Sequence, residues 1–249
     1  MRTAAFPVAI LAGGLATRLR PQTEAIPKAL IDVNGEPFVA HQLRLLRAHG
    51  IDRVVLCVGY LGEQIVQVVG NGSAFGLQVA YSFDQPTLLG TAGAIKPALP
   101  LLDENFFVLY GDSYLECDYR AIQTEFERAG KLALMTVYRN EGHWDTSNVE
   151  FAEGRILAYS KRERTPRMKY IDYGLGVFSR AAFAGIPENS PYDLESLYRD
   201  LLRQDQLAAC EVSQRFYEIG SPAGLDELRR LLRRTPAQAG GAREGRSSQ

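Results

Sequence analysis

A glycine-rich turn near the N-terminus carries the residue types best suited to chemistry in this chain. Gly13 and Gly14 follow an apolar run, residues 4–11, that predicts a buried first strand. Glycines let a backbone approach a ligand closely, and successive N–H groups in such a turn can point at phosphate oxygens. Arg18 adds a planar, permanently charged fork that suits phosphate, and Lys28 adds a second cation. The loop is therefore predicted to hold a polyphosphate.

The spacing within this loop separates it from the commoner phosphate loops. It lacks the G-x-x-x-x-G-K-[ST] pattern of Walker-type ATPases and the G-x-G-x-x-G pattern of nicotinamide- and flavin-binding folds. A glycine pair after a strand also occurs in ordinary tight turns. Thr17, Arg18 and Leu19, followed by Pro27 and Lys28, make the pattern specific, because the segment then reads G-G-x-x-T-R-L-x-P with a downstream P-K.

Two carboxylates stand at predicted strand ends from which they could face the same crevice. Asp112 follows the apolar run 106–110, at the edge where open α/β sheets bind their ligands. Glu218 follows an apolar pair and precedes a predicted helix start at Ser221. Proteins commonly hold Mg²⁺ with one or two carboxylates, phosphate oxygens and water. A shared magnesium site is one interpretation; a turn residue at 112 and a solvated strand-end charge at 218 are the alternatives.

These residues need a scaffold that brings the ends of several strands together. Strand-like and helix-like segments alternate through the first half of the chain, which favours a three-layer αβα sandwich around a largely parallel sheet. The predicted strands of this half cover residues 4–11, 54–60, 77–83, 106–110 and 132–138. Its predicted helices cover residues 37–49, 62–69, 91–102 with an interruption at Pro97, and 118–129.

The pattern changes after Arg139. A β-hairpin is predicted around the Glu153-Gly154 turn, and the last helix opens with Ser221 and Pro222. The other elements predicted in this half are strands at 148–151, 156–159, 174–178, 207–212 and 216–219 and a helix at 193–202. We expect an α/β fold with a Rossmann-like, mostly parallel mixed sheet and an added hairpin region. Residues 1–234 are predicted to form one domain, and residues 235–249, which have almost nothing to bury, a disordered tail.

Composition excludes several classes of protein. The 249 residues are 46% hydrophobic, which is ample for one sizeable core, and the formal net charge of −1 gives no reason to expect nucleic acid or an anionic membrane as a partner. No apolar run approaches the roughly 20 residues that span a bilayer, and no signal-peptide pattern is present. Cys57, Cys117 and Cys210 are widely spaced, which favours a reducing compartment. We expect a cytoplasmic protein, as a monomer or a small homo-oligomer.

The segment that begins with the glycine pair resembles the signature of nucleoside-triphosphate:sugar-1-phosphate nucleotidyltransferases. The resemblance extends from Ala5 to about Leu232. Gly111-Asp112 stands where members of that family carry the Asp that binds Mg²⁺, and Glu218 stands where they carry a second metal ligand in Asp-Ile-Gly-x-Pro. The resemblance implies transfer of a nucleotidyl group from an NTP to a sugar 1-phosphate, with release of pyrophosphate and with Mg²⁺ as cofactor. It also implies that the hairpin region forms the sugar side of the pocket.

The resemblance further implies which residues act and bind. The catalytic residues would be Arg18, Lys28, Asp112 and Lys161, and the metal ligands Asp112 and Glu218. The nucleotide-binding residues, which include a glycine-rich loop along the nucleobase and a base-reading Gln, would be Leu11, Ala12, Gly13, Gly14, Thr17, Arg18, Lys28, Gln85, Gly90, Thr91 and Ala92. The residues that bind the sugar phosphate would be Asn148, Lys161, Asp172, Gly174 and Glu195.

Three departures from the family pattern leave the substrates open. Ser160 replaces the Glu of the usual Glu-Lys-Pro, Asp172 replaces the pocket Asn, and Glu218 replaces an Asp. One alternative is the same chemistry on a non-sugar phosphate or phosphonate acceptor, as in cytidylyltransferases. Another is a catalytically silent nucleotide-sensing homologue, which the presence of Arg18, Lys28 and Asp112 disfavours. The base is also open, since the pattern resembles heptose- and mannose-1-phosphate guanylyltransferases and muramic-acid-1-phosphate uridylyltransferases alike.

Overall fold

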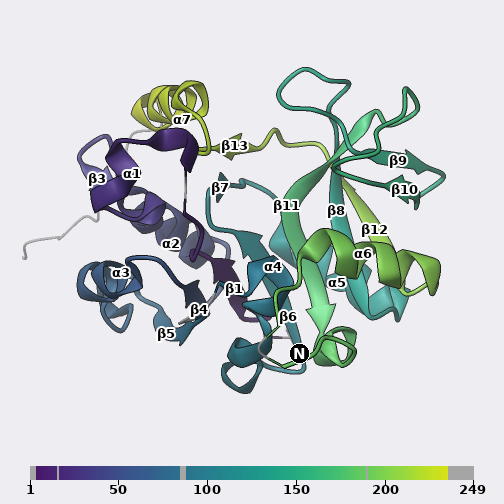
Figure 1. Cartoon of the computed structure of the whole chain (residues 1–249), viewed down its shortest axis with the longest axis horizontal. Helices are drawn as coiled ribbons and strands as arrows, with labels where there is room; N and C mark the ends of the chain where they lie inside the picture. The colour runs from purple at the N-terminus through teal and green to yellow at the C-terminus, as the bar shows by residue number, and fades with distance from the viewer. Residues whose placement is uncertain (1–3, 16, 85–87, 189, 235–249) are drawn as a thin grey trace, which may run out of the picture.

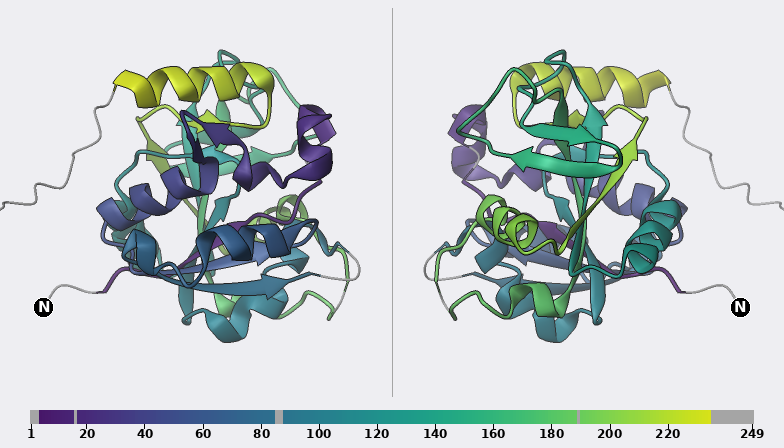
Figure 2. Two further views of the ribbon diagram at one scale, coloured as in Figure 1. Left: turned by 90° about the vertical axis from the view of Figure 1, so that its left-hand side faces the viewer. Right: turned by 90° about the vertical axis from the view of Figure 1, so that its right-hand side faces the viewer.

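The sheet at the centre of the protein contains nine strands in the described part of the chain, with helices on both of its faces (Figures 1 and 2). The structure is a computed structural model that describes residues 4–15, 17–84, 88–188 and 190–234. The predicted tail at 235–249 lies outside the described residues. The strands of this sheet are β1 (Val8–Leu11), β4 (Arg53–Val58), β5 (Gln78–Phe83), β6 (Asn105–Tyr110), β8 (Ala133–Arg139), β9 (Val149–Ala152), β10 (Arg155–Tyr159), β11 (Tyr170–Ser179) and β12 (Leu207–Val212).

The sheet has a parallel half and a mostly antiparallel half. In the parallel half, β1 lies between β4 and β6, and β5 pairs with the other edge of β4. In the other half, β11 runs antiparallel to both β6 and β8, β12 pairs parallel with β8, and the β9–β10 hairpin joins the sheet at the start of β11. This topology confirms the predicted Rossmann-like, mixed sheet. The carboxyl ends of β1, β4, β5 and β6 therefore meet at one edge.

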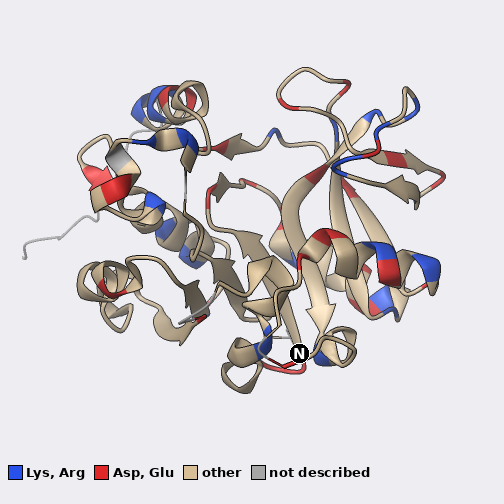
Figure 3. Cartoon of the chain, in the orientation of Figure 1, with Lys and Arg blue, Asp and Glu red and all other residues tan. Residues whose placement is uncertain are grey.

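Apolar side chains on both faces of the sheet explain the layered arrangement. Val8 and Ile10 of β1 belong to one buried cluster and Ala9 to another, because successive side chains of a strand point to opposite faces. The charged side chains lie mainly on helices and outer loops, and β1 and β6 carry none (Figure 3). Helices α2 (Phe38–Ala48), α3 (Gly62–Val69) and α5 (Tyr119–Ala129) contribute to the first cluster, and α4 (Gly90–Gly93) and α6 (Leu194–Arg203) to the second. Within the described residues, no helix combines the length and apolar composition needed to cross a bilayer.

The helix predicted over 91–102 is interrupted as expected, but the break comes a few residues before Pro97 and the second part is not an α-helix. It is divided into α4 and a 3-10 helix over Lys96–Leu101. Pro97 and Pro100 lack the N–H groups that would continue an α-helix, and they account for the break. The strand predicted at 174–178 is instead the longer β11, which has an irregular register between Asp172 and Gly176. The predicted hairpin turn is confirmed, and both of its residues have positive φ, as a type I′ turn requires.

Two small two-stranded sheets lie outside the central sheet, and one of them joins the C-terminal segment to the residues that follow β6. Strand β13 (Tyr217–Glu218) pairs with β7 (Ser113–Tyr114), and β2 (Asp32–Val33) pairs with β3 (Glu36–Pro37). Helix α7 (Pro222–Arg234) packs near α1 (Gln22–Ala25) and α2 (Figure 1), where Leu225 and Leu228 join a buried cluster with Leu19 and Phe38. The protein thereby places Glu218 close to the first glycine loop.

Candidate active site

A cavity of about 370 Å³ opens at the edge where the parallel strands end. Its wall includes the glycine pair on one side and Lys161 on the other. The predicted site residues that line it are Leu11, Ala12, Gly13, Gly14, Lys28, Gly90, Thr91, Asp112 and Lys161. Gln85, the predicted base-reading residue, lies outside the described residues. Two walls that come from distant parts of the chain therefore face a single cavity.

Gly111 sets the position of Asp112 beside the glycine loop. The Gly111 N–H donates to the Leu11 carbonyl at 3.1 Å, so the chain after β6 passes directly against the end of β1. A Cβ atom at residue 111 would lie 2.1 Å from the Leu11 carbonyl oxygen, a distance that no side chain tolerates. Only glycine permits this approach, and the next residue, Asp112, is consequently held at the cavity wall.

Lys28 and Asp112 form an ion pair within the cavity wall. Lys28 Nζ lies 2.9 Å from Asp112 Oδ2, and the two side chains are 18% and 31% exposed. Lys28 begins a 3-10 turn directly after Pro27, in the loop that the sequence pattern singles out. Both groups are partly exposed, so each keeps a face that a phosphate or a cation can approach.

Glu218 is brought to Asp112 by the β7–β13 pairing. Glu218 is the register partner of Ser113, and the Ile219 N–H donates to the Asp112 carbonyl at 2.9 Å. The Glu218 carboxylate accepts hydrogen bonds from the Ser221 hydroxyl at 2.8 Å and from the Gly220 N–H. These contacts confirm that two carboxylates far apart in sequence are neighbours in the fold.

A point beside Gly220 shows how closely the charged groups converge. A Cβ atom built there would lie 3.1 Å from an Arg18 guanidinium nitrogen, 3.3 Å from Asp112 Oδ2 and against the Glu218 carboxylate. Among the described residues, no group of three or more His, Cys, Asp or Glu is placed to hold a metal. Two carboxylates nevertheless suit Mg²⁺, which takes one or two of them and fills its remaining positions with phosphate oxygens and water. Asp112 and Glu218 therefore fit a hard divalent cation.

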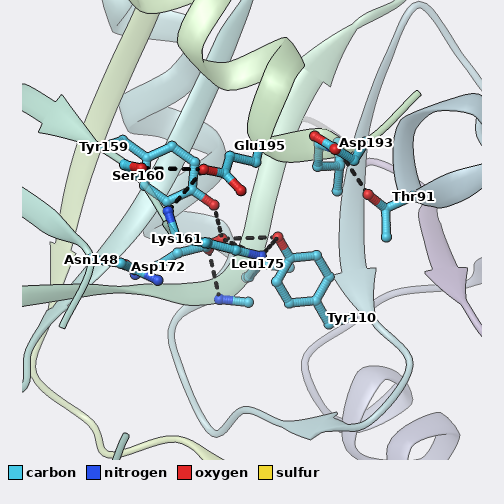
Figure 4. Close-up of polar contacts among 12 residues, drawn as sticks. Thr91, Tyr110, Asn148, Tyr159, Ser160, Lys161, Asp172, Leu175, Asp193 and Glu195 are labelled. Atoms are coloured by element: carbon cyan, nitrogen blue, oxygen red, sulfur yellow. Dashed lines mark hydrogen bonds and ion pairs between the residues drawn. The ribbon is translucent and has the colours of Figure 1, made fainter. Parts of the chain in front are cut away.

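Lys161 also lines the cavity and lies just after β10, beside Tyr110 (Figure 4). Its backbone N–H donates to Glu195 Oε1 at 2.8 Å, and the Ser160 hydroxyl lies 3.5 Å from the same oxygen. Glu195 belongs to the first turn of α6, whose N-cap is Asp193. Glu195, predicted to contact a sugar, thus contacts the loop that carries Lys161.

The predicted sugar-pocket residues Asn148 and Asp172 face protein groups. The Asp172 side chain is only 3% exposed. Its Oδ2 accepts from the hydroxyls of Tyr110 at 2.8 Å and Tyr159 at 3.2 Å, and its Oδ1 accepts from the Gly174 N–H at 3.1 Å. Asn148 Oδ1 accepts from the Asp172 N–H at 2.9 Å. Burial, together with the Asp172 charge, raises the pKa of both tyrosines above the ordinary value, so both hydroxyls stay protonated donors.

Among the residues of the cavity wall that sequence reasoning missed, Asp84 and Tyr110 carry oxygen atoms that can form hydrogen bonds. Asp84 follows β5 and is 6% exposed; its Oδ2 accepts from the Leu89 N–H at 3.4 Å, and its Oδ1 has no hydrogen-bond partner among the described residues. Burial raises the pKa of the Asp84 carboxyl. The signal that identified Asp112, a carboxylate directly after an apolar strand, applies equally to Asp84. The sequence around Tyr110 did not indicate a site residue, because a tyrosine at the end of an apolar strand is usually part of the hydrophobic core.

The loop at residues 90–92, predicted to lie along the nucleobase, is hydrogen-bonded to the start of α6 and to the segment that precedes it. The Thr91 hydroxyl accepts from the Leu194 N–H at 2.7 Å (Figure 4), and the Ala92 N–H donates to the Tyr192 carbonyl at 2.9 Å. Thr17 and Arg18 lie in a 3-10 turn after the glycine pair. The predicted nucleotide-binding residues that the structure describes are therefore placed along one side of the cavity or next to it.

Comparisons with known proteins agree with this arrangement. A family model described as nucleotidyl transferase matches residues 8–228. An N-acetylmuramate alpha-1-phosphate uridylyltransferase of Neisseria meningitidis is 31% identical over 229 residues, which cover 89% of this chain and 96% of the relative. A D-glycero-alpha-D-manno-heptose 1-phosphate guanylyltransferase of Campylobacter jejuni is 26% identical over 214 residues, covering 86% and 94% of the two chains.

Longer proteins and solved structures also match. The chain spans 52% of a UTP–glucose-1-phosphate uridylyltransferase and 61% of a mannose-1-phosphate guanyltransferase. The crystal structure of HddC from Yersinia pseudotuberculosis superposes with a TM-score of 0.77 at 23% identity, over 91% of this chain and 99% of that one. At that identity the superposition shows a shared fold.

Proposed function

The chain belongs to the nucleotidyl transferase family, and from this membership we propose how its cavity joins an NTP to a sugar 1-phosphate. The reaction transfers a nucleotidyl group and releases pyrophosphate. One observation carries the assignment of the site: a single cavity is lined both by the glycine loop with Lys28 and by Lys161. Cationic side chains at two places in one cavity suit two phosphate-bearing substrates, whose reacting phosphates must be aligned for in-line attack.

The triphosphate binds on the side of the glycine loop. The N–H groups around Gly13 and Gly14 donate hydrogen bonds to phosphate oxygens, and Arg18 holds the β- and γ-phosphates, which leave as pyrophosphate. Lys28 lies between the triphosphate and the incoming group, where it neutralises charge that develops on the α-phosphate. Its ion pair with Asp112, at 2.9 Å, keeps the ammonium at that position before substrates bind.

Asp112 and Glu218 are the residues that would hold Mg²⁺. The bound ion would neutralise charge on the phosphate oxygens, which is the chemistry that a hard cation supplies in such sites. The pairing of β7 with β13 and the hydrogen bonds to Glu218 from Ser221 and Gly220 fix the second carboxylate for this role.

The acceptor phosphate binds to Lys161. A phosphate monoester has a second pKa near 6, so it is largely dianionic at neutral pH and attacks without a general base. The protein therefore needs to orient and neutralise two anions, and it needs no proton acceptor at the reacting oxygen. Glu195 supports this role by holding the backbone of Lys161 at 2.8 Å.

The relatives narrow the substrates to be tried first. They are named as enzymes of N-acetylmuramate, heptose, mannose and glucose 1-phosphates, with UTP or GTP as the nucleotide implied by their names. We propose a sugar 1-phosphate of this group as acceptor and UTP or GTP as donor. We also propose one catalytic domain over residues 1–234 and a cytoplasmic location, which the free cysteines support.

A pyrophosphate-release screen tests this function. Four NTPs are crossed with the 1-phosphates of N-acetylmuramic acid, glucose, mannose and D-glycero-D-manno-heptose, with Mg²⁺ and with EDTA. One donor–acceptor pair should release pyrophosphate and yield the NDP-sugar, and EDTA should abolish the reaction. Folded protein that releases no pyrophosphate with any pair would contradict the proposal.

A further inference from the structure

A chain of hydrogen bonds connects Lys161 to a buried carboxylate through Tyr110 (Figure 4). Lys161 Nζ donates to the Tyr110 hydroxyl at 3.3 Å, and that hydroxyl donates to Asp172 Oδ2 at 2.8 Å. Lys161 Nζ also lies 4.9 Å from the centroid of the Tyr110 ring, within the range of a cation–π contact. Both the ring and the hydroxyl of one tyrosine therefore hold the ammonium group.

The carboxylate at the end of this chain is fixed in place. Asp172 is 3% exposed, and its oxygens accept from Tyr110, Tyr159 and the Gly174 N–H. A buried charge is tolerated only where it is paired and hydrogen-bonded, and these donors meet that need. Asp172 Oδ2 lies 4.0 Å from Lys161 Nζ, so the negative charge acts on the ammonium from a constant position.

Lys161 itself stays open to the cavity. Its side chain is 42% exposed and lines the cavity wall, whereas Asp172 and Tyr159 do not line it. Glu195 holds the Lys161 backbone from one side while Tyr110 contacts its ammonium from the other. A lysine has a flexible four-carbon stem, and ordering it before a ligand arrives removes part of the entropic cost of binding.

We propose that Tyr110 is a positioning residue for Lys161, and that Asp172 supports it both by holding the Tyr110 hydroxyl and by its charge 4.0 Å from the ammonium. This inference rests on the proposed function, in which Lys161 binds the phosphate of the sugar 1-phosphate. Tyr110 ends β6 and is followed directly by Gly111 and Asp112. The end of one strand thereby carries both the residue that positions the acceptor-binding ammonium and the proposed metal-binding carboxylate.

The test compares three variants by their KM for each substrate, in the donor–acceptor pair that the screen identifies. Tyr110→Leu removes ring and hydroxyl and should raise the KM for the acceptor about tenfold, as expected for loss of a cation–π contact and a charge-assisted hydrogen bond. Tyr110→Phe keeps the ring and should raise it about threefold. The KM for the NTP should change less than about twofold in both, because this chain of hydrogen bonds joins Lys161, Tyr110 and Asp172 and does not include the glycine loop.

Tyr159→Phe is the matched control. It removes a buried hydroxyl that donates to the same Asp172 oxygen, but Tyr159 has no hydrogen bond to Lys161 among the described contacts. The acceptor KM of Tyr159→Phe should therefore stay near that of the wild type. An increase equal to that of Tyr110→Phe would overturn the proposal, because it would show that only the burial of Asp172 matters. If Tyr110→Leu does not fold, the comparison of the acceptor KM of Tyr110→Phe with that of Tyr159→Phe still tests the proposal.

A double-mutant cycle separates positioning from simple steric contact. In a Lys161→Ala background, Tyr110→Leu should have no further effect on the acceptor KM, since it acts through Lys161. A persisting tenfold effect would overturn the inference and leave Lys161 in its proposed role. If Lys161→Ala alone leaves the acceptor KM unchanged, the proposed role of Lys161 fails, and the inference fails with it.

Discussion

The two sides of the cavity hold their charges in different ways. The donor side, which we define as Gly13, Gly14, Arg18, Lys28 and Asp112, brings its charged groups into direct contact, with Lys28 2.9 Å from Asp112. The proposed acceptor side consists of Lys161 and the residues that hold it in place, namely Tyr110, Asp172 and Glu195.

The difference follows from the role that we propose for each side. A triphosphate carries several negative charges, and several cations and N–H groups together can bind them even if no single side chain is ordered beforehand. A single phosphate must be held in line for attack, and one flexible lysine achieves this only if it is ordered beforehand. The donor side would thus bind its phosphates by the number of its positive groups, and the acceptor side by the ordering of one lysine before its ligand binds.

Asp112→Asn is the most severe way to break the donor side. It removes the partner of Lys28 and one of the two proposed metal carboxylates, so kcat should fall by about a thousandfold. Adding Glu218→Gln should cost little more, since residues that act as a unit are non-additive. Asp118→Asn, at the N-cap of α5, is the matched control and should keep wild-type kcat. Additive losses at 112 and 218 would show that the two carboxylates act separately.

Gly111→Ala disturbs both sides at once, because residue 111 separates Tyr110 from Asp112. A Cβ atom there would lie 2.1 Å from the Leu11 carbonyl oxygen, so the chain must shift. We expect a loss of about 2 kcal/mol in the free energy of unfolding, measured by denaturant titration, and raised KM values for both substrates. Gly185→Ala is the control, since nothing lies within 4 Å of a Cβ there. Wild-type stability in Gly111→Ala would contradict the close approach.

Asp84→Asn should have the smallest effect, and it tests the stability of the cavity wall next to Gly13. Burial raises the pKa of the Asp84 carboxyl, so its ionised form is disfavoured in the folded state and stability falls as pH rises through that pKa. An amide has no such cost, and its oxygen can still accept from the Leu89 N–H. The Tm of Asp84→Asn should exceed that of the wild type by about 2 °C at pH 7, and the difference should vanish toward pH 3. A lower Tm at pH 7 would mean that ionised Asp84 is stabilising.

The donor side could be predicted from sequence because its residues are local to recognisable turns. The glycine pair follows one apolar strand and Asp112 follows another, and parallel strands bring their carboxyl ends to one edge. Helix α3 and strand β12 also occupy the residues predicted for them. Local patterns of apolar residues were sufficient for these elements.

The acceptor side could be predicted only in part. Lys161 was placed by resemblance, but the burial of Asp172 depends on Tyr110 and Tyr159, which come from two other strands. Nothing in the residues near Asp172 indicates those partners, and a carboxylate at an expected pocket position suggests a ligand contact instead. Contacts assembled across strands far apart in sequence leave no periodicity or spacing to identify them.

The division between the two sides is tested most directly by measuring the kinetic constants for each of the two substrates in two single variants, Arg18→Ala and Lys161→Ala. Arg18→Ala should lower kcat/KM for the NTP by about a hundredfold, as for loss of one charge contact to the reacting phosphates, and Arg20→Ala in the same loop should not. Lys161→Ala should raise the KM for the sugar 1-phosphate about tenfold and leave the KM for the NTP within about twofold. An active Arg18→Ala enzyme, or equal weakening of both substrates by Lys161→Ala, would contradict the account.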